Sequence, residues 1–116
     1  MRFMTLVKSA ESNGQPPQAL MDAIGKLGDE AVRNGTMIQM GGLFPSIAGA
    51  RLRVANGKIV VTDGPFSEAK EVIGGFAVFE LPSKEAAVDA ARRFMELHRE
   101  HWPGWEGETE VRQIFG

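Results

Sequence analysis

The chain contains no cysteine, which excludes disulfide bonds, thiolate nucleophiles and zinc or iron–sulfur sites ligated by cysteine. An excess of charge is also missing, since 13 basic and 15 acidic residues leave a net charge of −2. Nucleic-acid-binding domains rely on a basic surface, so we predict no nucleic-acid partner. No apolar run has the length of a signal peptide or a bilayer span, which predicts a cytoplasmic protein without a membrane partner.

What the chain does contain is the composition of a folded domain. Hydrophobic residues make up 43 % and charged residues 24 % of its 116 positions. This length is close to the commonest size of one domain, so we expect residues 1–116 to share a single core. The chain has no phosphate-binding loop and no dinucleotide fingerprint, and we predict no cofactor.

The spacing of apolar residues predicts six strands and two helices. The strands are expected at residues 2–8, 36–44, 51–55, 58–62, 72–81 and 109–115, and the helices at 18–34 and 83–100. Ser83 is suited to cap the second helix, and Gly35 to end the first. Asn56-Gly57 between two short strands predicts a hairpin. Gly28 is expected to allow close packing of its helix, and Gly41-Gly42 to mark a bulge or bend.

The predicted elements follow the order β-α-β, a hairpin, then β-α-β. This order predicts an α+β fold, a ferredoxin-like split βαβ domain with an inserted β-hairpin. Apolar residues point to both faces of the predicted strands, as Phe3 and Leu6 do in the first one. Two helices cover only one face of a sheet, so the other face needs a cover. A second copy of the chain is the simplest cover, and we predict a homodimer.

One segment resembles a known family. Val61-Thr62-Asp63-Gly64-Pro65-Phe66 is followed by Lys70-Glu71 and Gly74-Gly75-Phe76, and it is preceded by Gly42-Leu43 and Pro45-Ser46. With the hairpin and the second helix, these motifs resemble the DGPF branch of the YCII-related family over nearly the whole chain. The resemblance implies a dimeric α+β barrel with a pocket near the cleft between subunits. It also implies small enzymes that use a histidine–aspartate pair, with elimination as one activity.

The family's histidine falls on the first helix, and residues 18–34 of this chain contain no histidine. The resemblance therefore transfers only the aspartate, to Asp63. It also suggests Gly42, Pro65 and Phe66 as candidate substrate-binding residues. For Pro65 and Phe66, plugging the end of the sheet fits better than stacking on a ligand.

Asp63 has two interpretations. A turn aspartate accepts a hydrogen bond from the amide two residues on, but here that residue is Pro65, which has no N–H. The carboxylate could still accept from Phe66 or Ser67 and be a structural residue. Alternatively, a carboxylate at a strand end acts as a general base or orients one.

His98 is the second candidate catalytic residue, because it lies near the centre of the apolar stripe of the helix at 83–100. A histidine that faces inward is more often a core residue, but in a pocket its pKa would suit proton transfer near neutral pH. His101 follows three residues later, at a spacing that two metal ligands can use. The helix dipole also favours cations at this end, and we predict no metal site.

Trp102 and Trp105 flank the end of the second predicted helix, which Pro103 stops. Two tryptophans this close must bury a large area, in the core, at a subunit contact or in a pocket wall. The core or a subunit contact fits them better than a ligand contact.

Two functions of different classes remain open. In the first, the protein is a cofactor-independent acid–base enzyme, in which Asp63 and His98 act on a small organic molecule through proton abstraction or elimination. In the second, it is a non-catalytic dimeric module that binds a small-molecule ligand or serves as a regulatory accessory. The enzyme requires both side chains to reach one cavity, whereas the module requires a pocket without converging titratable groups.

Overall fold

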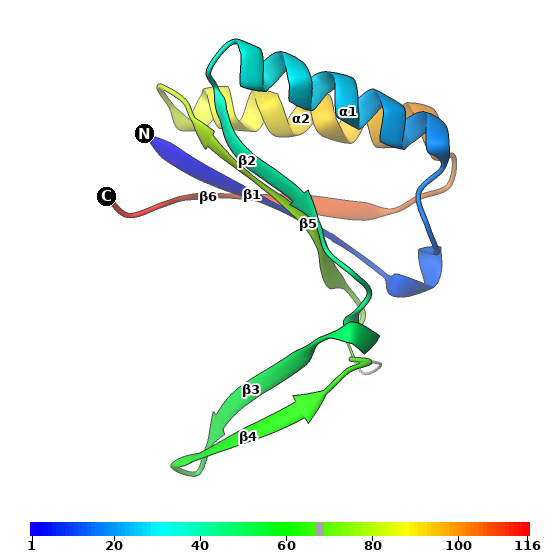
Figure 1. Cartoon of the computed structure of the whole chain (residues 1–116), viewed down its shortest axis with the longest axis vertical. Helices are drawn as coiled ribbons and strands as arrows, with labels where there is room; N and C mark the ends of the chain where they lie inside the picture. The colour runs from blue at the N-terminus through cyan, green and yellow to red at the C-terminus, as the bar shows by residue number, and fades with distance from the viewer. Residues whose placement is uncertain (67–68) are drawn as a thin grey trace.

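Helices and strands follow one another in the order expected from the sequence (Figure 1). The computed structural model describes residues 1–66 and 69–116. The strands are β1 Arg2–Ser9, β2 Met37–Gly42, β3 Ala50–Ala55, β4 Lys58–Asp63, β5 Val72–Glu80 and β6 Gly107–Gln113, and the helices are α1 Gln18–Arg33 and α2 Lys84–His101. Short 3-10 turns lie at Glu11–Asn13 and Ser46–Ala48. The fold is therefore of the predicted α+β class.

Four strands form the main sheet in the order β2-β5-β1-β6. All neighbouring strands in it are antiparallel, and Phe3 of β1 lies opposite Phe79 of β5 and Gln113 of β6. Helix α1 connects β1 to β2, which are separated by β5, and α2 connects β5 to β6, which are separated by β1. This arrangement is the ferredoxin-like split βαβ topology.

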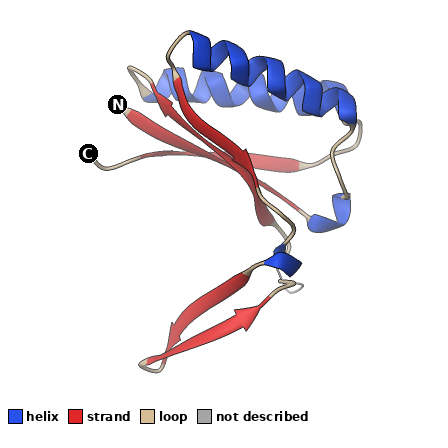
Figure 2. Ribbon diagram, viewed as in Figure 1, coloured by secondary structure: helices blue, strands red, loops and turns tan. Residues whose placement is uncertain are grey.

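Both helices lie on one face of the main sheet (Figure 2). The hydrophobic core between the helices and the sheet is formed by the buried side chains Phe3, Leu20, Phe79, Ala87 and Ala91. Gly28 of α1 is also buried, and a Cβ atom there would lie 2.6 Å from Met40 Sδ of β2. The prediction that Gly28 permits close packing is confirmed.

The opposite face of the main sheet, which we call the open face, carries apolar side chains. Met4 and Leu6 alternate along β1 with the buried Phe3 and Thr5, and so point away from the helices. The register places Val78 and Phe76 of β5 beside them. These four side chains, Met4, Leu6, Phe76 and Val78, are only partly buried.

Local sequence signals place the ends of several elements. The Ser83 Oγ accepts a hydrogen bond from the Ala86 N–H at 3.1 Å and so caps α2. Gly35 follows α1 with a φ of 80°, the left-handed conformation that glycine tolerates best. Asn56 and Gly57 have φ angles of 53° and 75° in the turn between β3 and β4.

Of the two alternatives predicted for Gly41-Gly42, a bulge or a bend, the bulge is wrong. The register of β2 on β5 shifts between Met37 and Gln39, whereas Gly41 pairs with Phe76 in regular register. A Cβ atom on Gly41 would lie 3.0 Å from a carbon of the Phe76 ring. Glycine at this position therefore makes room for an aromatic ring on the open face.

Strands β3 and β4 form a two-stranded sheet of their own. This hairpin projects from the main sheet on the side away from the helices (Figures 1 and 2). The turn at Ser46–Ala48 and the segment from Asp63 to Phe66 lie at its base. Among residues 1–66 and 69–116, no helix is long and apolar enough to cross a membrane.

Candidate functional site

Asp63 is the last residue of β4 and pairs with Ala50 of β3 at the base of the hairpin. Its side chain is exposed. Ser67, one of its expected hydrogen-bond donors, lies outside the described residues. The other, the Phe66 N–H, donates to a different side chain. Within residues 1–66 and 69–116, the Asp63 carboxylate forms no hydrogen bond or ion pair.

The backbone that follows Asp63 is held against the Ser46–Ala48 turn. The Phe66 N–H donates to Ser46 Oγ at 2.9 Å, and the Gly64 N–H donates to the Gly49 carbonyl at 2.8 Å. A Cβ atom on Gly64 would overlap the Ser46 carbonyl oxygen, so only glycine permits this approach. We call residues 63–66, together with Ser46 and its partner Glu11, the anchored segment.

Ser46 is itself buried and bonded to Glu11, in the turn after β1. Its hydroxyl donates to Glu11 Oε1 at 2.5 Å, and its N–H donates to Glu11 Oε2 at 2.7 Å. Both hydrogen bonds lower the pKa of the Glu11 carboxyl, and the bond from the Ser46 hydroxyl has the larger effect. The hydroxyl thus donates to Glu11 and accepts from Phe66, and so connects the turn after β1 to residues 63–66.

The three candidate substrate-binding residues differ in their surroundings. The ring of Phe66 is half-buried, and its centroid lies 4.4 Å from the guanidinium carbon of Arg51, a cation–π contact. Pro65 is exposed beside it. Gly42 lies at the end of β2 opposite Gly75. Pro65 and Phe66 therefore belong to the anchored segment, whereas Gly42 belongs to the edge of the main sheet.

His98 lies on the buried side of α2, with an exposed fraction of 5 %. Its Nδ1 lies 3.0 Å from the Phe94 carbonyl oxygen, and its ring centroid lies 4.6 Å from that of Phe94 and 4.5 Å from that of Trp105. Because a carbonyl only accepts, Nδ1 carries the proton, and Nε2 is the basic nitrogen of the neutral ring. Burial lowers the pKa of His98, and the hydrogen bond to Phe94 opposes that effect.

The structure places Asp63 and His98 in different layers of the molecule. His98 faces the core between α2 and the main sheet, whereas Asp63 stands on the hairpin beyond the other face of that sheet (Figure 2). No hydrogen bond or ion pair joins them within the described part of the chain. Their action as one acid–base pair stays a prediction, and a single chain does not bring them into contact.

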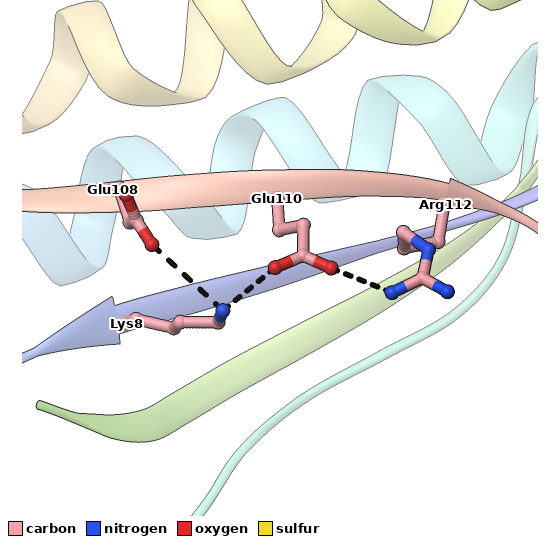
Figure 3. A network of polar contacts seen from close by, with 4 residues as sticks. All are labelled: Lys8, Glu108, Glu110 and Arg112. Carbon is pink, nitrogen blue, oxygen red and sulfur yellow. Dashed lines mark hydrogen bonds and ion pairs between the residues drawn. The ribbon is translucent and has the colours of Figure 1, made fainter.

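A second polar cluster lies on the open face (Figure 3). Lys8 Nζ lies 2.6 Å from Glu110 Oε1 and 3.8 Å from Glu108 Oε1, and Arg112 Nη1 lies 2.8 Å from Glu110 Oε2. The hydrogen bonds from Lys8 and Arg112 lower the pKa of Glu110 to about 2, and the bond to Glu110 raises the pKa of Lys8. Both groups are therefore charged near neutral pH.

Sequence reasoning named Ser46 only as part of the family motif, and it missed the contact of Ser46 with Glu11 and this cluster. Glu11 and Ser46 are 35 residues apart and meet only in the folded chain, so no local pattern announces their contact. The cluster did leave a signal, since Glu108, Glu110 and Arg112 alternate along the last strand and must share one face.

The end of α2 carries a shallow hollow of about 410 Å³, lined by Met95, Arg99, Trp102, Trp105 and Glu106 among others. The two tryptophan rings are stacked, with centroids 5.9 Å apart and an angle of 26° between their planes. Trp105 also covers His98. In the described residues, no three histidine or acidic side chains are placed to share a metal ion.

Comparison with known proteins gives two matches. The model of the YCII-related domain matches residues 1–99. An uncharacterised protein of Rhizobium meliloti (strain 1021) is 34 % identical over 86 residues, which cover 74 % of this chain and 68 % of that protein. The family match includes β1 to β5, the hairpin and the anchored segment.

Proposed function

This chain belongs to the YCII-related family, and on that basis we propose that it binds a small organic molecule at the anchored segment as a homodimer. One observation carries the proposal. The Asp63 carboxylate is exposed and free of protein partners in the described residues, while the backbone beside it is fixed by Ser46, Gly49 and Glu11. The sequence Asp63-Gly64-Pro65-Phe66 supports a place in the DGPF branch of the family.

A rigid backbone that ends in an unpaired carboxylate suits the recognition of an outside group. The anchoring bonds fix the orientation of the segment before any ligand arrives, so little conformational entropy is lost when the ligand binds. A carboxylate accepts hydrogen bonds strongly from hydroxyl, amide or ammonium groups. The half-buried Phe66 ring offers an apolar surface next to it. The ligand we expect therefore combines a hydrogen-bond donor with a small apolar body.

The homodimer is supported by the open face. Met4, Leu6, Phe76 and Val78 form an apolar strip on the side of the sheet that carries no described helix. Water contact with such a strip is unfavourable, and a two-fold dimer would bury the same strip from both copies. With the two sheets facing one another, the pair would form the dimeric α+β barrel expected of the family.

A thermal-shift screen of a library of small organic molecules tests the proposal, with wild type and Asp63→Asn compared. A compound that binds at the anchored segment stabilises the wild type and binds at least tenfold more weakly to Asp63→Asn, because the charge-assisted hydrogen bond is lost. The matched control is Asp89→Asn, an exposed aspartate on α2. Compounds that bind all three proteins equally would contradict the assignment of the site.

The second candidate function is acid–base catalysis on the bound molecule, and one observation favours it. The hydrogen bond to Phe94 fixes the tautomer of His98 and leaves Nε2 as a base, the state required for proton abstraction. The reaction would remove a proton from a carbon of the ligand. For Asp63 and His98 to share the acid and base roles, the ligand has to reach Nε2 of the buried His98, which one chain holds in a different layer from Asp63.

Solvent exchange separates this enzyme from the binding module. A ligand from the screen is incubated with the protein in D₂O, and its proton spectrum is followed by NMR. Catalysis predicts loss of a carbon-bound proton signal, abolished by Asp63→Asn and by His98→Gln. If the wild type binds the ligand without hydrogen exchange, catalysis is contradicted and the non-catalytic binding module is the function that remains.

A further inference from the structure

The β3–β4 hairpin carries an exposed apolar face. Leu52 pairs with Val61 and Val54 with Ile59, so these four side chains share one side of the hairpin. The exposed fractions of these side chains are 68 % for Leu52, 61 % for Val61, 79 % for Val54 and 71 % for Ile59. A two-stranded hairpin is marginally stable alone, and such a face normally packs against a core. In the described part of this chain, nothing covers it.

The hairpin also differs from the rest of the chain in charge. Between residues 50 and 63 lie three cations, Arg51, Arg53 and Lys58, and one anion, Asp63, which makes +2. Because the whole chain has a net charge of −2, the remaining residues carry −4. The hairpin and the body are therefore of opposite sign, and the hairpin of one copy is attracted to the body of another.

Carboxylates are concentrated near the open face. Glu108 and Glu110 lie on it in β6, and Glu71, Glu106 and Glu108 line a hollow of about 560 Å³ where β6 begins. Lys8 and Arg112 neutralise part of this charge. The surface that needs an apolar cover thus has an acidic rim, and a hairpin of positive net charge is attracted to it at long range, although the cations lie on the side opposite the apolar face.

We propose that the β3–β4 hairpin is an arm that grips a second copy of this chain, its apolar face laid against the partner's body beside the partner's open face. The hairpin projects on the same side as the open face, so a copy that covers this face lies within its reach (Figure 2). Arg53 and Lys58 lie on the side of the hairpin opposite its apolar face, so they attract the partner's acidic rim through long-range charge and not through direct ion pairs. The inference rests on the proposed homodimer and adds the exchange of arms.

Arm exchange also locates the ligand site. Asp63 pairs with Ala50, two positions from the Leu52–Val61 pair, and therefore shares the apolar side of the hairpin. When the arm docks, Asp63 lies at the boundary between two subunits. The partner then supplies the second wall of the site, which is incomplete in a single chain.

A pair of matched substitutions tests the arm. Val54→Asp places a charge on the apolar face, and Val60→Asp places the same charge on the opposite face of the hairpin. Sedimentation velocity over a range of concentrations gives the dimer dissociation constant of each protein. We expect Val54→Asp to raise it at least tenfold and Val60→Asp less than threefold. Equal effects of the two substitutions, or none from Val54→Asp, would overturn the proposal.

A spin label gives a measurement that does not depend on a destabilising variant. The chain has no cysteine, so Ile59→Cys, on the exposed apolar face near the tip of the arm, accepts a nitroxide at one site only. The label should be immobilised in the dimer and released on dilution to monomer. A mobile label in a stable dimer would contradict the proposal that the hairpin grips the partner, but it would not contradict the homodimer. A chain that stays monomeric at all concentrations would contradict both the homodimer and the arm.

Discussion

At the scale of single residues, Ser46 is the residue on which the anchored segment depends. Its hydroxyl donates to Glu11 and accepts from Phe66, and its carbonyl oxygen leaves no room for a side chain on Gly64. Asp63 could be proposed from the sequence because the motif that contains it is continuous. Ser46 and Glu11 could not, because their roles arise from contacts between distant parts of the chain.

Replacing Ser46 by alanine should therefore loosen the segment. The variant leaves the Phe66 N–H without its acceptor and Glu11 with one donor fewer, and a lost partner of this kind costs about 1–3 kcal/mol of unfolding free energy. Urea denaturation followed by circular dichroism measures the loss. Ser12→Ala is the control, since Ser12 is exposed and lies in the same turn as Glu11. A Ser46→Ala protein as stable as Ser12→Ala would refute the anchoring role.

His98 should make stability depend on pH. Burial lowers its pKa in the folded chain below the ordinary value of 6.5, so the unfolded chain binds more protons between these two values. Its contribution to stability is thus complete above pH 6.5 and is lost as the pH falls through the folded value.

Two measurements check this expectation. Proton NMR follows the ring signals of the two histidines, and that of His98 should titrate below pH 6.5. The unfolding free energy of His98→Gln should also fall less between pH 7.5 and 5 than that of the wild type, with His101→Gln as control. A His98 signal that titrates at or above pH 6.5 would show that the ring is not desolvated.

At the scale of elements, local signals predicted much of what folded. Helix caps and tight turns act within a few residues, so the sequence alone predicted the caps at Ser83 and Gly35 and the turn at Asn56-Gly57. The bulge predicted at Gly41-Gly42 was wrong, because the register of β2 shifts between Met37 and Gln39 and Gly41 instead makes room for the Phe76 ring of the neighbouring strand. Periodicity also placed His98 on the buried side of α2, but it could not show that Asp63 lies in another layer.

The cluster on β1 and β6 predicts sensitivity to acid. The pKa of Glu110 is lowered from 4.5 to about 2 by Lys8 and Arg112, so its stabilising contribution is present above pH 4.5 and is lost as the pH falls through about 2. Glu110→Gln should flatten the fall of unfolding free energy between pH 5 and pH 2. Glu108→Gln, whose carboxylate lies 3.8 Å from Lys8, is the control and should keep most of the wild-type slope. Identical slopes for Glu110→Gln and wild type would contradict the ion pair.

At the scale of the whole molecule, the described residues of one chain leave two surfaces without a cover, the open face and the apolar side of the hairpin. The hairpin projects on the side of the main sheet away from the helices, where the open face lies, and the hairpin and the rest of the chain have net charges of opposite sign (Figure 1). A homodimer with exchanged arms covers both surfaces and brings Asp63 to the subunit boundary. The sequence predicted the dimer from the count of helices, but the arm needed the structure, because only there does the hairpin stand apart from the main sheet.

Association should consequently depend on salt. Attraction between the cationic hairpin and the acidic body is screened within about 10 Å at 0.1 M ionic strength, and more strongly at higher salt. The rate of dimer formation, measured by stopped-flow mixing of labelled chains, should fall as NaCl is raised from 0.05 to about 0.5 M. An Arg53→Gln, Lys58→Gln double variant should associate slowly at all salt concentrations. A rate that is independent of salt in the wild type would contradict the charge argument.

Contact between the ligand and Asp63 on its anchored segment can be tested by a ¹H–¹⁵N NMR titration with a compound from the thermal-shift screen, in wild type and Asp63→Asn. We expect shifts at the Gly64 and Phe66 amides of the wild type and at least tenfold weaker binding to the variant. Unchanged affinity for the variant, with shifts confined to the Trp102–Trp105 hollow, would place the ligand site elsewhere.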